Sequence, residues 1–118
     1  MSDVNHLTVS GTIGKYAPGL FYTANAKPYC EFSIGIWEQG TDDQLHPTFV
    51  DVRVVGKQAE ALSVALEPGD RVFIPSGRLQ WKPGRSKDLG KHMITCYAVD
   101  VISHAAAAVE SANSRVVS

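Results

Sequence analysis

The chain has 118 residues, the size of one small domain, and its content of 44% hydrophobic and 19% charged residues is typical of a folded globular protein, not of a disordered one. It has no apolar run near the ~18 residues that a membrane-spanning helix needs, and its first residues lack the basic and apolar regions of a secretory signal. A formal net charge of −1 argues against a protein that binds polyanions over its whole surface.

The first half of the chain is predicted to form three strands, because apolar and polar residues alternate along it with a period of two. The three segments are residues 3–14, 28–38 and 48–55. Residues 14–27 contain Gly, Pro and Asn with scattered aromatics and are expected to form a long loop. In the second segment the face that begins with Cys30 is apolar and is expected in the core, which leaves Trp37 on the opposite, polar face.

The second half is predicted to form one helix and two further strands. Residues 57–67 have apolar side chains at helical spacing, and the Pro-Gly that follows ends the helix. The fourth strand is expected from 71 to about 82, with a bulge or bend at the Pro-Ser-Gly of residues 75–77. A basic turn at residues 83–91 leads to the fifth strand, at about 92–102.

This order of elements predicts an all-β domain, a five-stranded Greek-key barrel with one helix between the third and fourth strands, which is the OB-fold layout. A mixed α+β sheet of similar order is the competing architecture. The barrel is expected to comprise residues 1–102. Residues 103–118 lack a periodic apolar face and are expected to form a flexible C-terminal tail.

Basic residues are concentrated around the predicted turn between the fourth and fifth strands. This stripe contains one acidic residue and five basic ones: Arg78, Lys82, Arg85, Lys87 and Lys91. Such a stripe can attract anions although the whole chain is nearly neutral. The alternative is a solvated hairpin tip without a ligand.

Four segments, in register along the chain, resemble the bacterial-type single-stranded DNA-binding proteins. They are residues 5–14 (NHLTVSGTIG), 29–36 (YCEFSIGI), 55–60 (VGKQAE) and 66–74 (LEPGDRVFI). The resemblance implies an OB-fold that binds and protects single-stranded DNA without strict sequence specificity during replication, recombination or repair. It also implies a homo-oligomer, a tetramer or alternatively a dimer, with replication proteins as further partners. The expected location is the cytoplasm, with the nucleoid, or the equivalent in an organelle, phage or plasmid system.

The chain departs from this family pattern at several places. Phe49 stands where a tryptophan is usual, Val55 stands where an aromatic residue often precedes Gly-Lys, and Ser76 is an extra residue in the fourth strand. The chain ends at Ser118 without the family's glycine-rich linker and acidic tip, and in this it also resembles the primosomal replication protein N, a dimeric relative. The alternative function is therefore an OB-fold protein-interaction module of that type, which binds a replication partner and has weak affinity for nucleic acid.

Binding of single strands needs cations along the backbone path and exposed aromatic faces on which bases stack. In OB-folds the site lies on the second and third strands and the flanking loops. The candidate nucleic-acid-binding residues are therefore Trp37, Phe49, Arg53, Arg78, Trp81, Lys82, Arg85, Lys87, Lys91, Lys15 and Tyr22. For the aromatic residues the alternative is a subunit interface or, in the long loop, packing against the barrel. Tyr97 is expected in the core or in an interface.

No pattern of catalytic, cofactor-binding or metal-binding residues stands out. The four histidines have no ligand-like spacing, and no phosphate-binding loop or nucleophile motif is present. Cys30 and Cys96 are too few and too far apart for a disulfide framework and are expected to be buried free thiols in a reducing, intracellular setting. We therefore expect a binding protein that is not an enzyme and that needs no cofactor, no metal and no membrane.

Overall fold

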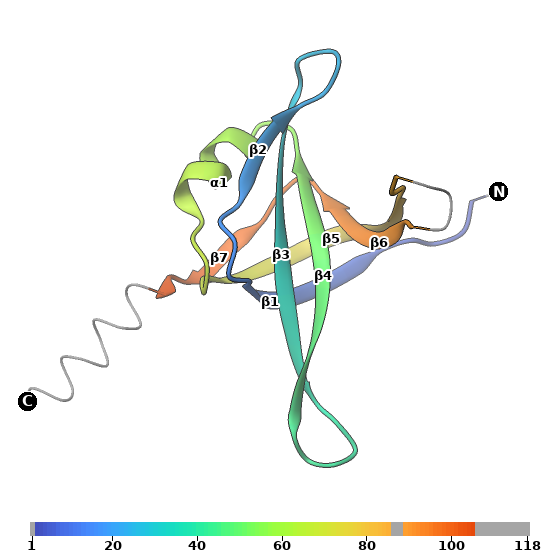
Figure 1. Ribbon diagram of the computed structural model, residues 1–118, viewed down its shortest axis with the longest axis vertical. Coiled ribbons are helices and arrows are strands. Elements are labelled where there is room, and N and C mark those ends of the chain that lie inside the picture. Colours follow the sequence, from blue (N-terminus) through green and yellow to red (C-terminus); the bar gives the residue numbers. More distant parts are fainter. Residues whose placement is uncertain (1, 86–88, 106–118) are drawn as a thin grey trace, which may run out of the picture.

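The computed structural model describes residues 2–85 and 89–105. Its elements, in chain order, are β1 (Leu7–Ile13), β2 (Gly19–Tyr22), β3 (Pro28–Gln39), β4 (Leu45–Val55), α1 (Ala59–Ala65), β5 (Arg71–Lys82), β6 (Lys91–Cys96) and β7 (Asp100–Ser103) (Figure 1). In this described part of the chain the one helix is α1, which lies between β4 and β5 as predicted. At seven residues it is too short to cross a membrane, and the described residues hold no helix that is long and apolar enough to do so.

Five of the strands close into a barrel. The pairs β1–β3, β3–β4 and β5–β6 are antiparallel, whereas β4 and β6 run parallel. The barrel closes because β1 also pairs with β5, for example through Thr12 and Arg71. Closure pairs the edges that an open sheet of this size would leave exposed. The predicted five-stranded barrel with one helix is confirmed, and the mixed open sheet is wrong.

The core consists of the apolar strand faces that the alternation predicted. On β3, Cys30, Phe32 and Ile34 are at most 5% exposed, and α1 adds Ala59 and Leu62 to the same cluster. Because successive side chains of a strand point to opposite faces, the residues between the buried ones point outward. The packing of the core thereby determines which side chains of β3 and β4 form the outer face of the barrel.

The long loop predicted at residues 14–27 is wrong in part, because residues 19–22 form β2. This strand pairs with the start of β3, where Leu20 lies opposite Cys30. Four residues are too few to show a recognisable alternation. The strand forms for a tertiary reason: β1 pairs with β3 near Ile34, and β2 satisfies the backbone groups of β3 that lie before that contact.

The fifth predicted strand, residues 92–102, is in fact two strands. β6 ends at Cys96 beside β4, and β7 begins at Asp100 beside β5. Between them the side chain of Tyr97 is 74% exposed, so it does not lie in the core, whereas Val99 is buried. The apolar pattern continues through the break, and for this reason the sequence did not reveal it.

β3 and β4 continue past the barrel as a two-stranded ribbon, which projects downward in Figure 1. Their pairing extends to Gln39 and Leu45, so β4 begins three residues earlier than the predicted strand at 48–55. Trp37 lies opposite Pro47 on this ribbon. The bulge predicted in the fourth strand is confirmed, since the register between β1 and β5 shifts at residues 75–76.

The last described residues are held by a buried carboxylate. Asp70 is fully buried and accepts hydrogen bonds from the backbone N–H groups of Glu67 (3.0 Å) and Ala105 (2.9 Å). His104 Nδ1 lies 3.1 Å from the same carboxylate. Burial alone would raise the pKa of Asp70, but these hydrogen bonds and the nearby imidazole hold it below its ordinary value. Asp70 thereby joins the turn before β5 to the residues that follow β7.

Candidate nucleic-acid interface

Polar side chains line the middle of the outer face of β3 and β4. Glu31 lies opposite Arg53, and Ser33 lies opposite Asp51, in the antiparallel register of the two strands. The Ser33 hydroxyl donates a hydrogen bond of 2.8 Å to the Asp51 carboxylate. All four alternate with core residues, so the burial of the valines and isoleucines on the other face forces them outward.

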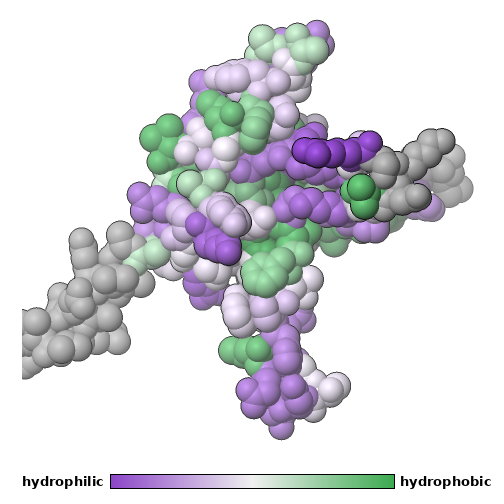
Figure 2. All heavy atoms as spheres, in the orientation of Figure 1, coloured by the Kyte–Doolittle hydropathy of each residue, from purple (hydrophilic) through white to green (hydrophobic). Residues whose placement is uncertain are grey.

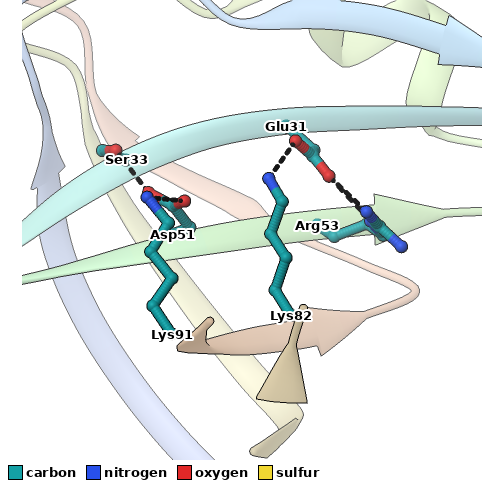
Figure 3. Close-up of polar contacts among 6 residues, drawn as sticks. All are labelled: Glu31, Ser33, Asp51, Arg53, Lys82 and Lys91. Carbon is teal, nitrogen blue, oxygen red and sulfur yellow. Dashed lines mark hydrogen bonds and ion pairs between the residues drawn. The ribbon is translucent and has the colours of Figure 1, made fainter. Parts of the chain in front are cut away.

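Three of the predicted cations reach these two carboxylates (Figure 3). Glu31 accepts hydrogen bonds from Arg53 Nε (2.8 Å) and from Lys82 Nζ (3.0 Å), and Lys91 Nζ lies 2.7 Å from the Asp51 carboxylate. Lys82 and Lys91 are themselves directly opposite each other in the β5–β6 pair. Two like charges at such a position repel, and the two carboxylates beneath them compensate for this. We call Glu31, Asp51, Arg53, Lys82 and Lys91 the charge cluster.

The charge cluster keeps its carboxylates ionised. Burial alone would raise the pKa of Glu31, but hydrogen bonds and positive charges from Lys82 and Arg53 hold it below its ordinary value. In the same way, Lys91 and Ser33 hold the pKa of Asp51 below its ordinary value against the effect of burial. At neutral pH the cluster therefore has three positive and two negative charges. Its positive field is much weaker than its cations alone would produce.

Two exposed aromatic rings lie together beyond one end of the charge cluster. Trp37 is 54% exposed and Phe49 is 68% exposed. Gly35, directly opposite Phe49, leaves the space between them: a Cβ atom there would lie 3.1 Å from Phe49 Cε1 and 3.3 Å from Trp37 Nε1. The two rings form an accessible apolar surface of the kind on which bases stack.

A third exposed ring lies on the β5–β6 hairpin. Trp81 packs edge-on against His92, with 5.1 Å between ring centroids, and it crosses the backbone of Gly90, where any Cβ would overlap the indole. Arg85 is exposed in the turn beyond it. Lys87 lies outside the described residues. Figure 2 shows apolar side chains scattered among hydrophilic ones over the face that carries β3 and β4.

The remaining predicted residues lie away from the Trp37–Phe49 pair. Tyr22 is at the opposite end of β3, where its hydroxyl lies 3.4 Å from Glu60. Lys15 follows β1, and its ammonium group lies 5.2 Å from the ring centroid of Tyr16. Arg78, on β5, lines a hollow that it shares with Arg53. The structure thus brings most of the predicted residues to one face and leaves Lys15 and Tyr22 at its margins.

The model of the single-strand binding protein family matches residues 4–104. The chain belongs to this family. The match spans every element from β1 to β7 and confirms the resemblance that the four sequence segments carry. Among curated proteins, no sequence matches the chain.

Solved structures of single-stranded DNA-binding proteins share this family member's fold. The wild-type protein from Thermus aquaticus superposes with a TM-score of 0.72 at 22% identity, over 87% of this chain and 52% of that chain. The chain thus spans about half the length of the Thermus protein. The small protein from Streptomyces coelicolor gives a TM-score of 0.67 at 20% identity, over 86% of this chain and 94% of that chain. These structural similarities show that the chain has the OB-fold.

Sequence reasoning missed the acidic half of the candidate interface in this single-strand binding family member. Glu31 and Asp51 share the outward parity of Trp37 and Phe49, so the alternation alone places them on the same face. The alternation does not show that Lys82 and Lys91, which belong to the β5–β6 pair, contact these two carboxylates. Tyr29 is also part of this face: Arg53 lies 4.6 Å from its ring centroid, and Phe21 stacks on it at 5.5 Å.

The described residues offer no alternative site for metal or thiol chemistry. Within residues 2–85 and 89–105, no group of three or more His, Cys, Asp and Glu side chains could hold a metal ion. Cys30 and Cys96 are buried free thiols, as predicted, and burial raises the pKa of each to about 11. At neutral pH both stay protonated, so neither is an activated nucleophile.

Proposed function

We propose that this protein binds and protects single-stranded DNA without strict sequence specificity, on the outer face of β3 and β4 and on the β5–β6 hairpin. The observation that carries the proposal is the arrangement of exposed aromatic rings beside a line of cations on one face. Trp37 and Phe49 lie at one end of this face and the charge cluster lies in the middle, whereas Trp81, next to Lys82 on β5, points to the other side of the hairpin. The family membership of the chain supports the same function.

The mechanism is electrostatic attraction followed by stacking. Phosphates approach Arg53, Lys82 and Lys91, and neighbouring bases stack on the exposed rings, each worth ~1–3 kcal/mol. Because every base has an aromatic face, this mode of binding does not require a particular sequence. Phosphate contacts release counterions, so the affinity falls as the salt concentration rises. Protection of single strands in replication, recombination or repair needs nothing more than this, and it requires no catalytic group, cofactor or metal.

We propose that the protein acts as a homo-oligomer, a tetramer or a dimer, and the same charges support this. The cations of one protomer are few, and the carboxylates of the charge cluster offset part of their charge. Several such faces on one assembly can hold one strand by effective concentration, which raises the overall affinity without any new contact. We place the assembly in the cytoplasm with the nucleoid, or in the equivalent organelle, phage or plasmid setting, with replication proteins as further partners.

Intrinsic tryptophan fluorescence tests the proposal directly. Oligo-dT is titrated into the full chain at low and at moderate salt, with duplex DNA of equal length as the control. Stacking on Trp37 or Trp81 predicts quenching by the single strand that weakens with salt. The absence of quenching, together with no preference for single strands at low salt, contradicts the proposal.

A second function is favoured by one observation, the pairing of three cations with Glu31 and Asp51, which offsets most of their positive charge. A face of weak positive charge with exposed aromatic rings also suits a protein partner, as in a module of the primosomal replication protein N type. Replacement of Lys82, Arg85 and Lys87 by Glu separates the two functions. DNA binding predicts near-complete loss of affinity for oligo-dT, whereas a protein-interaction module predicts little change in partner binding.

A further inference from the structure

Tyr97 lies between two hollows on the outer face of the barrel. It occupies the break between β6 and β7, and its ring is 74% exposed. Both hollows are lined by Tyr97 and by Val55, the last residue of β4. An aromatic side chain that stands exposed between two concave surfaces can contact a ligand that occupies either of them.

The first hollow is polar and basic. Its volume is about 240 Å³, and its lining includes the guanidinium groups of Arg53 and Arg78 together with Ser76, Gln80 and Thr95. Among the described residues, its lining contains no carboxylate. Arg53 donates from Nε and Nη2 to Glu31, and since a guanidinium has five N–H donors, it keeps others for a further acceptor. This surface suits a phosphate group, which Arg binds through paired hydrogen bonds.

The second hollow has apolar walls and a charged rim. Its volume is about 730 Å³, with Pro28, Tyr29, Val55 and Tyr97 among its walls. Gly56, which follows Val55 with a φ of +99°, leaves space in front of the Tyr97 ring. At the rim, the ammonium groups come from Lys27 and Lys57, and a carboxylate comes from Glu60. Flat apolar walls under a partly acidic rim suit a base better than a phosphate.

We propose that the two hollows together form a subsite for one nucleotide of a bound single strand, with its phosphate against Arg53 and Arg78 and its base stacked on the exposed ring of Tyr97, beside the wall that Tyr29 forms. The inference rests on the proposed function. DNA is the occupant that the charges favour, because four cations, Arg53, Arg78, Lys27 and Lys57, line the two hollows against one acid. The subsite is also continuous with the proposed interface, since Arg53 belongs both to it and to the charge cluster.

With the subsite included, the proposed interface has exposed aromatic rings at both ends of the outer face of β3. Along β3, Trp37 and Tyr29 are separated by about 26 Å, at ~3.3 Å for each residue of a strand. Between them lie Glu31, Ser33 and Gly35, which offer no ring. A bound strand therefore stacks bases at the Trp37–Phe49 pair and at Tyr97, and it passes the charge cluster with its phosphates.

Photochemical cross-linking locates the subsite in the wild-type protein. Oligo-dT that contains 5-iodo-deoxyuridine is bound to the full chain, irradiated, and mapped by mass spectrometry of the peptides. The proposal predicts cross-links at Tyr97 or Tyr29 in addition to those at Trp37, Phe49 or Trp81. Cross-links confined to the latter three overturn the subsite and leave the proposed function standing. Cross-links at none of the five contradict both.

Affinity measured against oligonucleotide length is the second test. We compare wild type, Tyr97→Ala and Tyr97→Phe with oligo-dT of about 4 to about 16 nucleotides, the usual range of site sizes for one OB-fold. Tyr97→Ala is expected to lose about 5- to 150-fold in affinity for the longer oligonucleotides, the fold-change of one stacked base. The shortest ones, which the Trp37–Phe49 end can hold alone, change little. Tyr97→Phe keeps the ring and stays within about twofold of wild type.

Three outcomes separate this inference from its alternatives. Unchanged affinity of Tyr97→Ala at every length overturns the subsite. A change in oligomeric state, measured by size-exclusion chromatography with unchanged affinity per protomer, also overturns it and assigns Tyr97 to an interface between copies. Failure of the wild-type protein to bind oligo-dT at any length contradicts the proposed function itself.

Discussion

Glu31 accepts a hydrogen bond from Lys82, which comes 51 residues later in the chain and approaches from a different strand pair. The same carboxylate also binds Arg53 on the neighbouring strand. Glu31 thus occupies the place at which a phosphate of a bound strand would meet these two cations. Any polyanion that binds here competes with a carboxylate already present, and this competition has measurable consequences.

Glu31→Gln is expected to strengthen the binding of single-stranded DNA. The substitution removes a negative charge from the interface and frees Lys82 and Arg53 for phosphates. Affinity for oligo-dT at low salt should rise several-fold, and log K should fall more steeply with log[salt], by about 0.7 for each additional phosphate contact. Fluorescence titration over a range of salt concentrations measures both. Glu67→Gln, in the exposed turn before β5, removes an equal charge away from the face and should leave the slope unchanged. Weaker binding by Glu31→Gln would instead mean that the carboxylate positions the cations.

Acid is expected to destabilise the fold through the charge cluster. Because the pKa values of Glu31 and Asp51 are lower in the folded protein than in the unfolded chain, the unfolded chain takes up protons first as the pH falls. The stabilisation is therefore fully present at neutral pH and is lost progressively below about pH 4.5, near the ordinary carboxyl pKa values. Denaturant unfolding at a series of pH values should show the free energy of unfolding decreasing there. Asp51→Asn should make the free energy of unfolding decrease less steeply in this pH range. If its pH dependence matches that of wild type, Asp51 does not contribute to the acid sensitivity.

Gly35→Ala is expected to disturb the Trp37–Phe49 pair while preserving the fold. The new Cβ would lie 3.1 Å from Phe49 Cε1 and 3.3 Å from Trp37 Nε1, so one ring must move. A shift in tryptophan emission and a loss of oligo-dT affinity should accompany a free energy of unfolding that changes by about 1 kcal/mol or less. The matched control is Gly14→Ala, whose Cβ would meet its nearest neighbour, in Ser33, at an ordinary 3.7 Å. If both variants behave alike, the rings do not depend on Gly35.

Trp37→Ala is expected to weaken DNA binding by about 5- to 150-fold, which corresponds to the ~1–3 kcal/mol of one stacked base. Leu45→Ala removes another exposed apolar side chain, 65% exposed, from the end of the same ribbon and serves as the control. Fluorescence anisotropy of a labelled oligo-dT measures both variants without relying on tryptophan emission. Equal affinities for the two variants would exclude Trp37 as a stacking platform.

Asp70→Ala is expected to reduce stability more than any of the surface substitutions. It leaves the backbone N–H groups of Glu67 and Ala105 without their acceptor, and each buried unsatisfied donor costs about 1–3 kcal/mol. The free energy of unfolding should fall by about 2–4 kcal/mol, measured by urea denaturation. Asp70→Asn keeps one carbonyl acceptor, so its free energy of unfolding should fall by less than that of Asp70→Ala. A variant as stable as wild type would show that these bonds exchange for water without cost.

Local patterns were enough to predict the barrel, because the alternation in β1, β3 and β4 and the helical spacing of α1 both follow from burial. The same parity placed Trp37, Phe49 and Arg53 on the outer face correctly. Two features escaped prediction because they depend on partners distant in the chain. β2 forms through its pairing with β3. After Cys96 the chain stops pairing with β4, and its next strand, β7, pairs with β5.

The charge cluster escaped prediction for a similar reason. From the sequence, the Lys and Arg side chains of residues 78–91 were predicted to form a positive stripe without acidic partners on other strands. The sequence does not show that β6 runs parallel to β4. That pairing brings Lys91 over Asp51, and the β5–β6 register brings Lys82 over Glu31. The electrostatic character of the interface is thus a property of the sheet topology.

The closure of the barrel also has a kinetic consequence. β1 and β5 meet through Thr12 and Arg71, and the charge cluster joins Glu31 to Lys82, so the contacts that define the interface span long stretches of chain. Topologies dominated by such distant pairings fold slowly, in milliseconds to seconds for small all-β domains. A newly made chain is therefore expected to form its helix and hairpins before the long-range pairings complete the candidate interface. On the proposed function, single-strand binding is expected only after the barrel has closed.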